Sequence, residues 1–174
     1  MTMTTLAIIT LLLTIAGVGV AIFKNKELPE SISGLVYDLP KKLQWLWTLW
    51  IWAITVTLAF PLMDATKGNT FQFLAFFLIA SLGFCGAIPL VAGEKNRAHY
   101  ALADIAGILS QLCVIIINPE WLKVWAWWIP LSFCIIFFDE KPWWWKIEDV
   151  IEGKGMMLVE LTAALALYAA LLSN

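Results

Sequence analysis

The chain has 174 residues, of which 61% are hydrophobic and 14% are charged, and its formal net charge is −2. An ordinary soluble domain carries about 25% charged residues, so this composition excludes that class, and the small net charge gives no reason to expect nucleic-acid binding. The mean hydropathy of +0.83 indicates an integral membrane protein.

Six stretches supply the roughly 20 mainly apolar residues that a helix needs to cross a bilayer. The predicted spans cover about residues 5–23, 44–63, 71–92, 100–118, 121–138 and 156–172. The connections between them are short and leave no room for a soluble domain. We therefore predict an all-α, polytopic helical bundle that forms a single transmembrane domain over residues 1–174. Small residues four apart, such as Gly17 and Ala21, predict close helix contacts.

Lys and Arg gather in alternate connections between the predicted spans. The first, third and fifth connections carry nine of the eleven: Lys24, Lys26, Lys41, Lys42, Lys95, Arg97, Lys141, Lys146 and Lys154. The opposite side has Lys67 and Lys123. Because basic residues favour the cytoplasmic side, we predict cytoplasmic basic loops and external N and C termini in a bacterial inner membrane. The first span is expected to be a retained anchor.

Two of the basic connections are predicted to hold amphipathic helices that lie on the cytoplasmic membrane surface. In the first, apolar residues recur at helical spacing from Leu28 to Leu39, with Pro29 placed to start the helix and Pro40 to end it. In the second, an apolar stripe runs from Trp143 to Ile151 and carries charged residues on its other side.

Eleven residues are Trp, a side chain that favours the headgroup boundary of a bilayer. They are Trp45, Trp47, Trp50, Trp52, Trp121, Trp125, Trp127, Trp128, Trp143, Trp144 and Trp145. We interpret them as interfacial belts, and an aromatic ligand cage is the alternative.

The fourth predicted span carries a row of polar residues. Arg97, Asp104, Gln111 and Asn118 are seven residues apart, so they share one helix face from the basic end to the other end. Polar groups at membrane depth normally face a cavity or another helix. This face is therefore our main candidate for a functional surface.

Two acidic residues are predicted to lie at the same depth in the membrane. Asp104 and Glu160 each lie about 7–8 Å inside the basic-side boundary, given a rise of about 1.5 Å per residue. Close carboxyls can share a proton or bind a cation, and Arg97 or His99 could modulate them. The structural alternative is that Asp104 bonds a neighbouring helix and only fixes packing.

Several other polar residues are weaker candidates for a functional site. Gln44, Thr48 and Thr55 form a second polar face that could line the same cavity, although Thr hydroxyls often bond their own helix. The one histidine, His99, is expected at the boundary, where it would contact phosphate or reach toward water.

One histidine cannot supply paired haem ligands or a zinc hydrolase site. Cys85, Cys113 and Cys134 form no C-x-x-C pair and are interpreted as small buried groups. We therefore predict no metal and no cofactor.

The leading hypothesis from these patterns is an oligomeric channel or transporter for a proton or small cation, with its pathway along the fourth span. One alternative is an accessory or scaffold subunit of a membrane complex. Another is a membrane enzyme that acts on lipid headgroups at the basic side with Asp104, Glu160, His99 and Arg97, although the sequence assigns no catalytic residue and favours a protein that is not an enzyme. The expected partners are the lipid bilayer and either further copies of the chain or another membrane protein.

Overall fold

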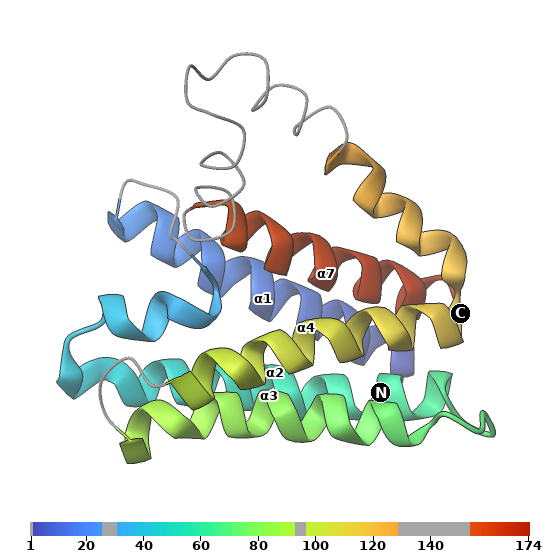
Figure 1. Cartoon of the computed structure of the whole chain (residues 1–174), viewed down its shortest axis with the longest axis horizontal. Helices are drawn as coiled ribbons and strands as arrows, with labels where there is room; N and C mark the ends of the chain where they lie inside the picture. The colour runs from blue at the N-terminus through green and yellow to red at the C-terminus, as the bar shows by residue number, and fades with distance from the viewer. Residues whose placement is uncertain (1, 26–30, 93–96, 129–153) are drawn as a thin grey trace.

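The computed structural model describes residues 2–25, 31–92, 97–128 and 154–174 (Figure 1). Five α-helices form a bundle, and short 3-10 helices lie at its two ends. The elements in chain order are α1 (Met3–Asn25), η1 (Ser33–Asp38), η2 (Lys41–Leu43), α2 (Gln44–Ala65), α3 (Phe73–Ala92), α4 (Arg97–Ile117), η3 (Pro119–Trp127) and α7 (Lys154–Leu172).

Four helices are long and apolar enough to cross a membrane. They cover Met3–Phe23, Lys41–Ala65, Phe73–Val91 and Arg97–Ile117, in agreement with the first four predicted spans. The chain is therefore an integral, multi-pass membrane protein.

The structure agrees less well with the last two predicted spans. The apolar part of α7, Met156–Leu172, matches the sixth span but is shorter than the other four helices. The fifth span is not shown as a long apolar helix, because its described part lies in the 3-10 helix η3. Pro119 and the Asn118 cap set the start of η3. Residues 129–138 of this span lie outside the described residues, as does the predicted amphipathic helix at 143–151.

Hydrogen bonds between helices define the direction in which each one runs. Thr10 bonds Thr57 and Trp50 bonds the Leu13 carbonyl, so α1 and α2 are antiparallel. The bonds from Gln111 to Ala163 and from Asn118 to Ser173 show that α4 and α7 are parallel.

Both termini lie at one end of the bundle (Figure 1). We call this the far end. The other end, where α2 and α4 begin beside Lys42 and Arg97, is the basic end.

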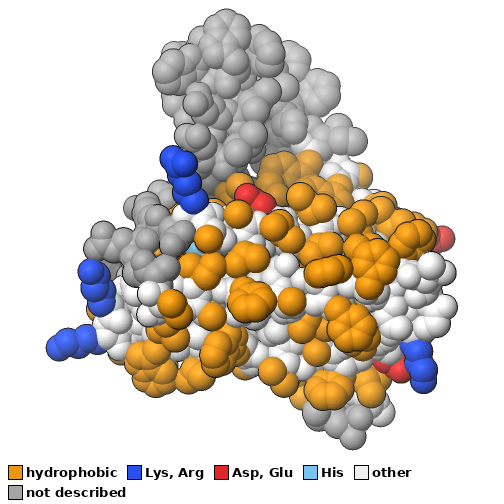
Figure 2. Space-filling view, turned by 60° about the horizontal axis from the view of Figure 1, so that its bottom comes forward, with side chains coloured by type: hydrophobic (Ala, Val, Ile, Leu, Met, Phe, Trp, Pro, Cys, Tyr) orange, Lys and Arg blue, Asp and Glu red, His pale blue; other side chains and the backbone are white. Residues whose placement is uncertain are grey.

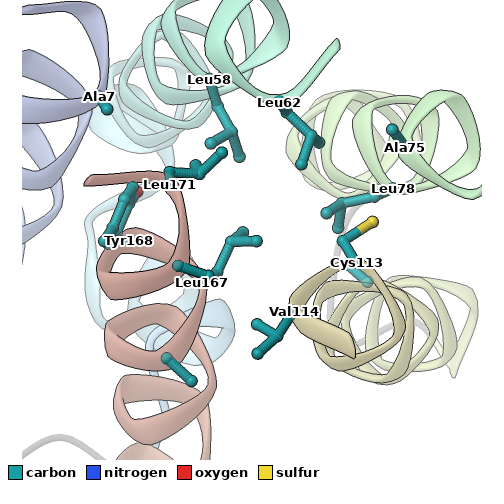
Figure 3. Close-up of a cluster of buried hydrophobic side chains, with 13 residues drawn as sticks. Ala7, Leu58, Leu62, Ala75, Leu78, Cys113, Val114, Leu167, Tyr168 and Leu171 are labelled. Carbon is teal, nitrogen blue, oxygen red and sulfur yellow. The ribbon is translucent and has the colours of Figure 1, made fainter. Parts of the chain in front are cut away.

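The core of the bundle is formed by apolar side chains from all five helices. Figure 3 shows Leu58 from α2, Leu78 from α3, Val114 from α4 and Leu167 from α7 pointing toward one another. Gly17 permits a close approach of α1 and α2, because a Cβ there would lie 2.2 Å from the Trp50 ring. This contact confirms one of the predicted small-residue seams.

Large hydrophobic side chains also cover the outside of the bundle. Examples are Val20 on α1, Phe77 on α3 and Ile108 on α4, each more than half exposed. Figure 2 shows hydrophobic side chains across one face, with Lys and Arg toward its margins. An apolar surface of this extent fits a helix bundle in contact with lipid chains.

The segment before α2 differs from the amphipathic helix predicted there. Its described part forms the short 3-10 helix η1 rather than an α-helix. Leu35 and Val36 are buried against Trp47, Ile51 and Cys85 of the bundle. The prediction that this apolar face rests on the membrane surface is therefore wrong, because the bundle itself covers it.

Candidate functional site

A partly open cavity of about 150 Å³ lies between the five described α-helices. Most of its wall is apolar and includes Leu58, Leu78, Leu82, Ala106 and Leu167. Part way along, Thr14 and Tyr168 line it and bond each other at 2.8 Å. At the basic end the wall becomes polar, where Ser33, Trp47, Cys85 and Glu160 meet.

Glu160 of α7 joins the bundle to the start of η1. Its Oε1 accepts a hydrogen bond from Ser33 Oγ at 2.6 Å, and its Oε2 accepts from the backbone N–H groups of Ile32 and Ser33. Free N–H groups at the start of a helix favour an anion. Glu160 therefore anchors the segment that closes the basic end of the cavity.

His99 is fully buried and lies directly behind this segment. Its Nε2 is 2.8 Å from the Ser33 carbonyl oxygen, and its Nδ1 is 3.1 Å from the Cys85 carbonyl oxygen and 3.6 Å from Cys85 Sγ. The predicted boundary role of His99 is therefore wrong. Its ring is enclosed by protein and has no route to a phosphate headgroup through the described residues.

Three aromatic rings surround the His99 imidazole. The ring centroids of Tyr37, Trp47 and Tyr100 lie 5.5, 5.4 and 5.4 Å from that of His99. The sequence suggested an aromatic cage as the alternative use of Trp, and Trp47 takes part in one around a side chain of the protein itself.

Trp47 also carries an unsatisfied donor. Its side chain is only 3% exposed and lines the cavity. Among the described residues, its indole N–H is the only buried side-chain polar atom without a hydrogen-bond partner. A buried donor without an acceptor costs free energy, so an unpaired group of this kind calls for an explanation.

The other predicted acid, Asp104, lies outside the cavity. Its side chain on α4 is exposed, although it is close enough to Glu160 to interact electrostatically. Arg97, also exposed, begins α4 at the basic end. Asp104 and Arg97 belong to the predicted polar row on α4, but neither of them lines the cavity.

The remaining residues of the α4 row form a separate network at the far end. Gln111 donates to the Ala163 carbonyl at 3.1 Å and accepts from Trp125 Nε1 at 2.9 Å. Asn118 donates to Ser173 Oγ at 3.3 Å, and its side chain also caps the start of η3. Both residues connect α4 with α7 and η3.

The second predicted polar face on α2 is used in packing. Thr48 donates to the Gly86 carbonyl of α3, and Thr55 donates to Ile51 of its own helix, both at 2.8 Å. Gln44, half-buried, begins α2. These three side chains are not part of the cavity wall.

Sequence reasoning selected Glu160 and His99 but missed three residues that join them. Ser33 lies in the segment that was predicted to be an amphipathic surface helix, Cys85 resembled an ordinary buried thiol, and Trp47 resembled a boundary residue. The described residues contain no group of three or more His, Cys, Asp or Glu side chains that could hold a metal ion.

A comparison with protein-family models, curated proteins and solved structures found no match for this chain. The geometry of the cavity therefore carries the functional argument.

Proposed function

We propose that this protein binds an amphiphilic lipid in the cavity, with the acyl chain among the helices and an ester or hydroxyl headgroup at the basic end. The observation that carries this proposal is the combination of a partly open apolar cavity with an unpaired donor, Trp47 Nε1–H, on its polar wall. An oxygen of the headgroup would give this donor the acceptor that it lacks.

The apolar wall suits a short stretch of a hydrocarbon chain, because the cavity volume is about 150 Å³, but it cannot by itself select one. Inside a bilayer the surrounding lipid is as apolar as the wall, so moving a chain into the cavity gains little hydrophobic free energy. Affinity must then come from close packing and from polar contacts. Trp47, Ser33 and Glu160 offer such contacts at the basic end, while the Thr14 and Tyr168 hydroxyls farther along the wall already bond each other.

The polar wall favours a neutral headgroup with an acceptor oxygen. Glu160 already accepts hydrogen bonds from Ser33 and from the Ile32 backbone, and these bonds occupy much of its capacity to hold a cation. Trp47 offers a donor alone. An ester carbonyl or a hydroxyl oxygen matches this arrangement better than an ammonium group.

Photolabelling of the wild-type chain in phosphatidylcholine liposomes tests this proposal. The probe is a long-chain fatty alcohol with a diazirine in the middle of its chain. We expect labelling of cavity residues such as Leu82 and Leu167 that an excess of unmodified alcohol abolishes. Labelling of the lipid-facing Phe77 and Ile108 should resist this competition. Labelling confined to the lipid-facing residues would contradict the proposal.

A proton or cation pathway along α4, the leading hypothesis from the sequence, is the second candidate. The electrostatic proximity of Asp104 and Glu160 favours it, because two nearby acids can pass or share a proton. Gln111 and Asn118 are committed to helix contacts, so this pathway would need further polar groups from another copy of the chain.

A further inference from the structure

We infer that Cys85 and His99 form a nucleophile and base pair that accepts the acyl group of a lipid ester bound in the cavity. This inference rests on the proposed binding function and adds a chemical step to it. The substrate class is an ester with one long acyl chain, and the product of the first step is an acyl thioester on Cys85.

Both ring nitrogens of His99 face a backbone carbonyl oxygen, Nε2 that of Ser33 at 2.8 Å and Nδ1 that of Cys85 at 3.1 Å. A neutral ring can donate to only one of them. The reaction uses the tautomer that donates from Nε2 to Ser33, in which Nδ1 is the acceptor and the thiol of Cys85 at 3.6 Å is the donor beside it. The His99 carbonyl lies farther from the same sulfur, at 3.9 Å.

The surroundings of His99 also accommodate the imidazolium that forms after proton transfer. Nδ1–H would then face the Cys85 carbonyl oxygen at 3.1 Å while Nε2–H keeps its bond to Ser33. Both N–H groups of the cation are thus paired. An apolar cavity disfavours an isolated thiolate, so the thiol needs a base in contact with it at the moment of attack.

Ser33 and Glu160 act as positioning residues for this base. The carbonyl of Ser33 orients the imidazole, while the N–H and hydroxyl of the same residue bond Glu160. A nucleophile, a base and a third group that orients the base are the elements of nucleophilic acyl transfer.

Trp47 supplies a donor for the oxyanion. Its ring lies against His99, it lines the same cavity as Cys85, and its N–H has no acceptor in the described part of the chain. A donor left free for the charge that develops on a carbonyl oxygen is the principle of an oxyanion hole.

The reaction balances with water as the second reactant. Cys85 Sγ attacks the ester carbonyl carbon while its proton moves to His99 Nδ1, and Trp47 Nε1–H bonds the oxyanion. The intermediate then collapses, the carbon–oxygen ester bond breaks, and the imidazolium gives its proton to the departing alcohol. Water, deprotonated by His99, subsequently attacks the thioester and releases a fatty acid and the Cys85 thiol.

Cys113 provides the matched control within the same fold. It is fully buried in the core cluster of the bundle and does not line the cavity. A general affinity of buried thiols for reactive esters would modify both residues, whereas the proposed pair modifies Cys85 alone.

The test uses 4-nitrophenyl decanoate with the full chain in lipid nanodiscs, quenched with acid before the thioester hydrolyses, followed by intact mass and peptide mapping. We expect a decanoyl group on Cys85 in wild type and Cys113→Ala, and none at position 85 in Cys85→Ser. His99→Gln should acylate about 100-fold more slowly if it remains folded. The wild-type mapping does not depend on any variant folding.

Equal acylation of Cys113, or of Cys134, would overturn the pair. A wild-type protein without a decanoyl group on Cys85 would also overturn the pair. In that case the photolabelling experiment distinguishes lipid binding from acyl transfer. Competable labelling of the cavity without acylation leaves lipid binding in place and removes the reaction, while loss of both signals contradicts both proposals.

Discussion

The two polar clusters of this bundle differ in how completely their hydrogen bonds are satisfied. At the far end, Gln111 pairs both its donor and its acceptor, and Asn118 joins Ser173. At the basic end, Glu160 and His99 are paired through Ser33, yet Trp47 keeps a free N–H beside a cavity. Both clusters connect distant segments, but only the second places an unpaired donor on the cavity wall.

This difference distinguishes a cluster that packs the helices together from one that we propose binds a ligand. A network that is satisfied and filled needs no ligand, because nothing is gained when one arrives. An unsatisfied donor next to a cavity lowers stability and is retained where a partner completes it. The variants below test whether the two ends differ in this way.

The largest expected effect is that of His99→Leu. The substitution leaves the Ser33 carbonyl without its donor and disturbs three packed aromatic rings, so we expect a loss of about 3 kcal/mol of unfolding free energy. Gln111→Leu at the far end should cost about 1–2 kcal/mol. Unfolding in mixed detergent micelles measures both. Equal losses of unfolding free energy would contradict the expectation that the basic-end cluster stabilises the fold more than the far-end cluster.

A smaller effect is expected for Glu160→Leu, which removes the acceptor of the η1 N–H groups and should cost about 1–3 kcal/mol. Hydrogen exchange at the Ile32 and Ser33 amides should accelerate. Glu160→Gln keeps one acceptor oxygen, so it should retain part of the protection. Unchanged exchange in Glu160→Leu would show that this carboxylate does not hold the segment.

The smallest change in stability is expected for Asp104→Asn, because its side chain is exposed. A shift within about 0.5 kcal/mol is typical of such positions. The same variant tests conduction in proteoliposomes. A pathway along α4 requires proton or cation flux in the wild type that this substitution reduces. Flux no greater than in empty liposomes would remove the channel hypothesis.

Hydropathy predicted the long helices well because length and apolarity are local properties of a sequence. The predicted spans 44–63 and 71–92 differ by two residues or fewer at each end from α2 and α3. Hydropathy failed to predict the structure of residues 121–127, where a membrane span was expected to begin. Pro119 and Asn118 start a 3-10 helix there, although the segment contains apolar residues such as Trp121 and Trp125.

The site was harder to predict because its contacts link distant parts of the chain. Glu160 bonds Ser33, which precedes it by 127 positions, and no periodicity reports such a pairing. The heptad row on α4 could not show that Gln111 and Asn118 bond α7 and the residue after it, nor that Asp104 lies outside the cavity. On α2, Trp45 and Trp47 looked alike in sequence, whereas one is half exposed and the other buried.

The most direct test of lipid binding is to fill the cavity. Gly107 lines it, and a Cβ built there meets no atom within 4 Å apart from its chain neighbours and the backbone of its own helix, so the side chain of Gly107→Leu begins in open space on the cavity wall. Gly19 has the same open surroundings on the exposed side of α1 and gives the matched control. We predict that Gly107→Leu weakens competable photolabelling of the cavity at least about tenfold, or about 1.4 kcal/mol, while Gly19→Leu leaves it unchanged. Equal labelling of both variants would contradict a ligand in this cavity.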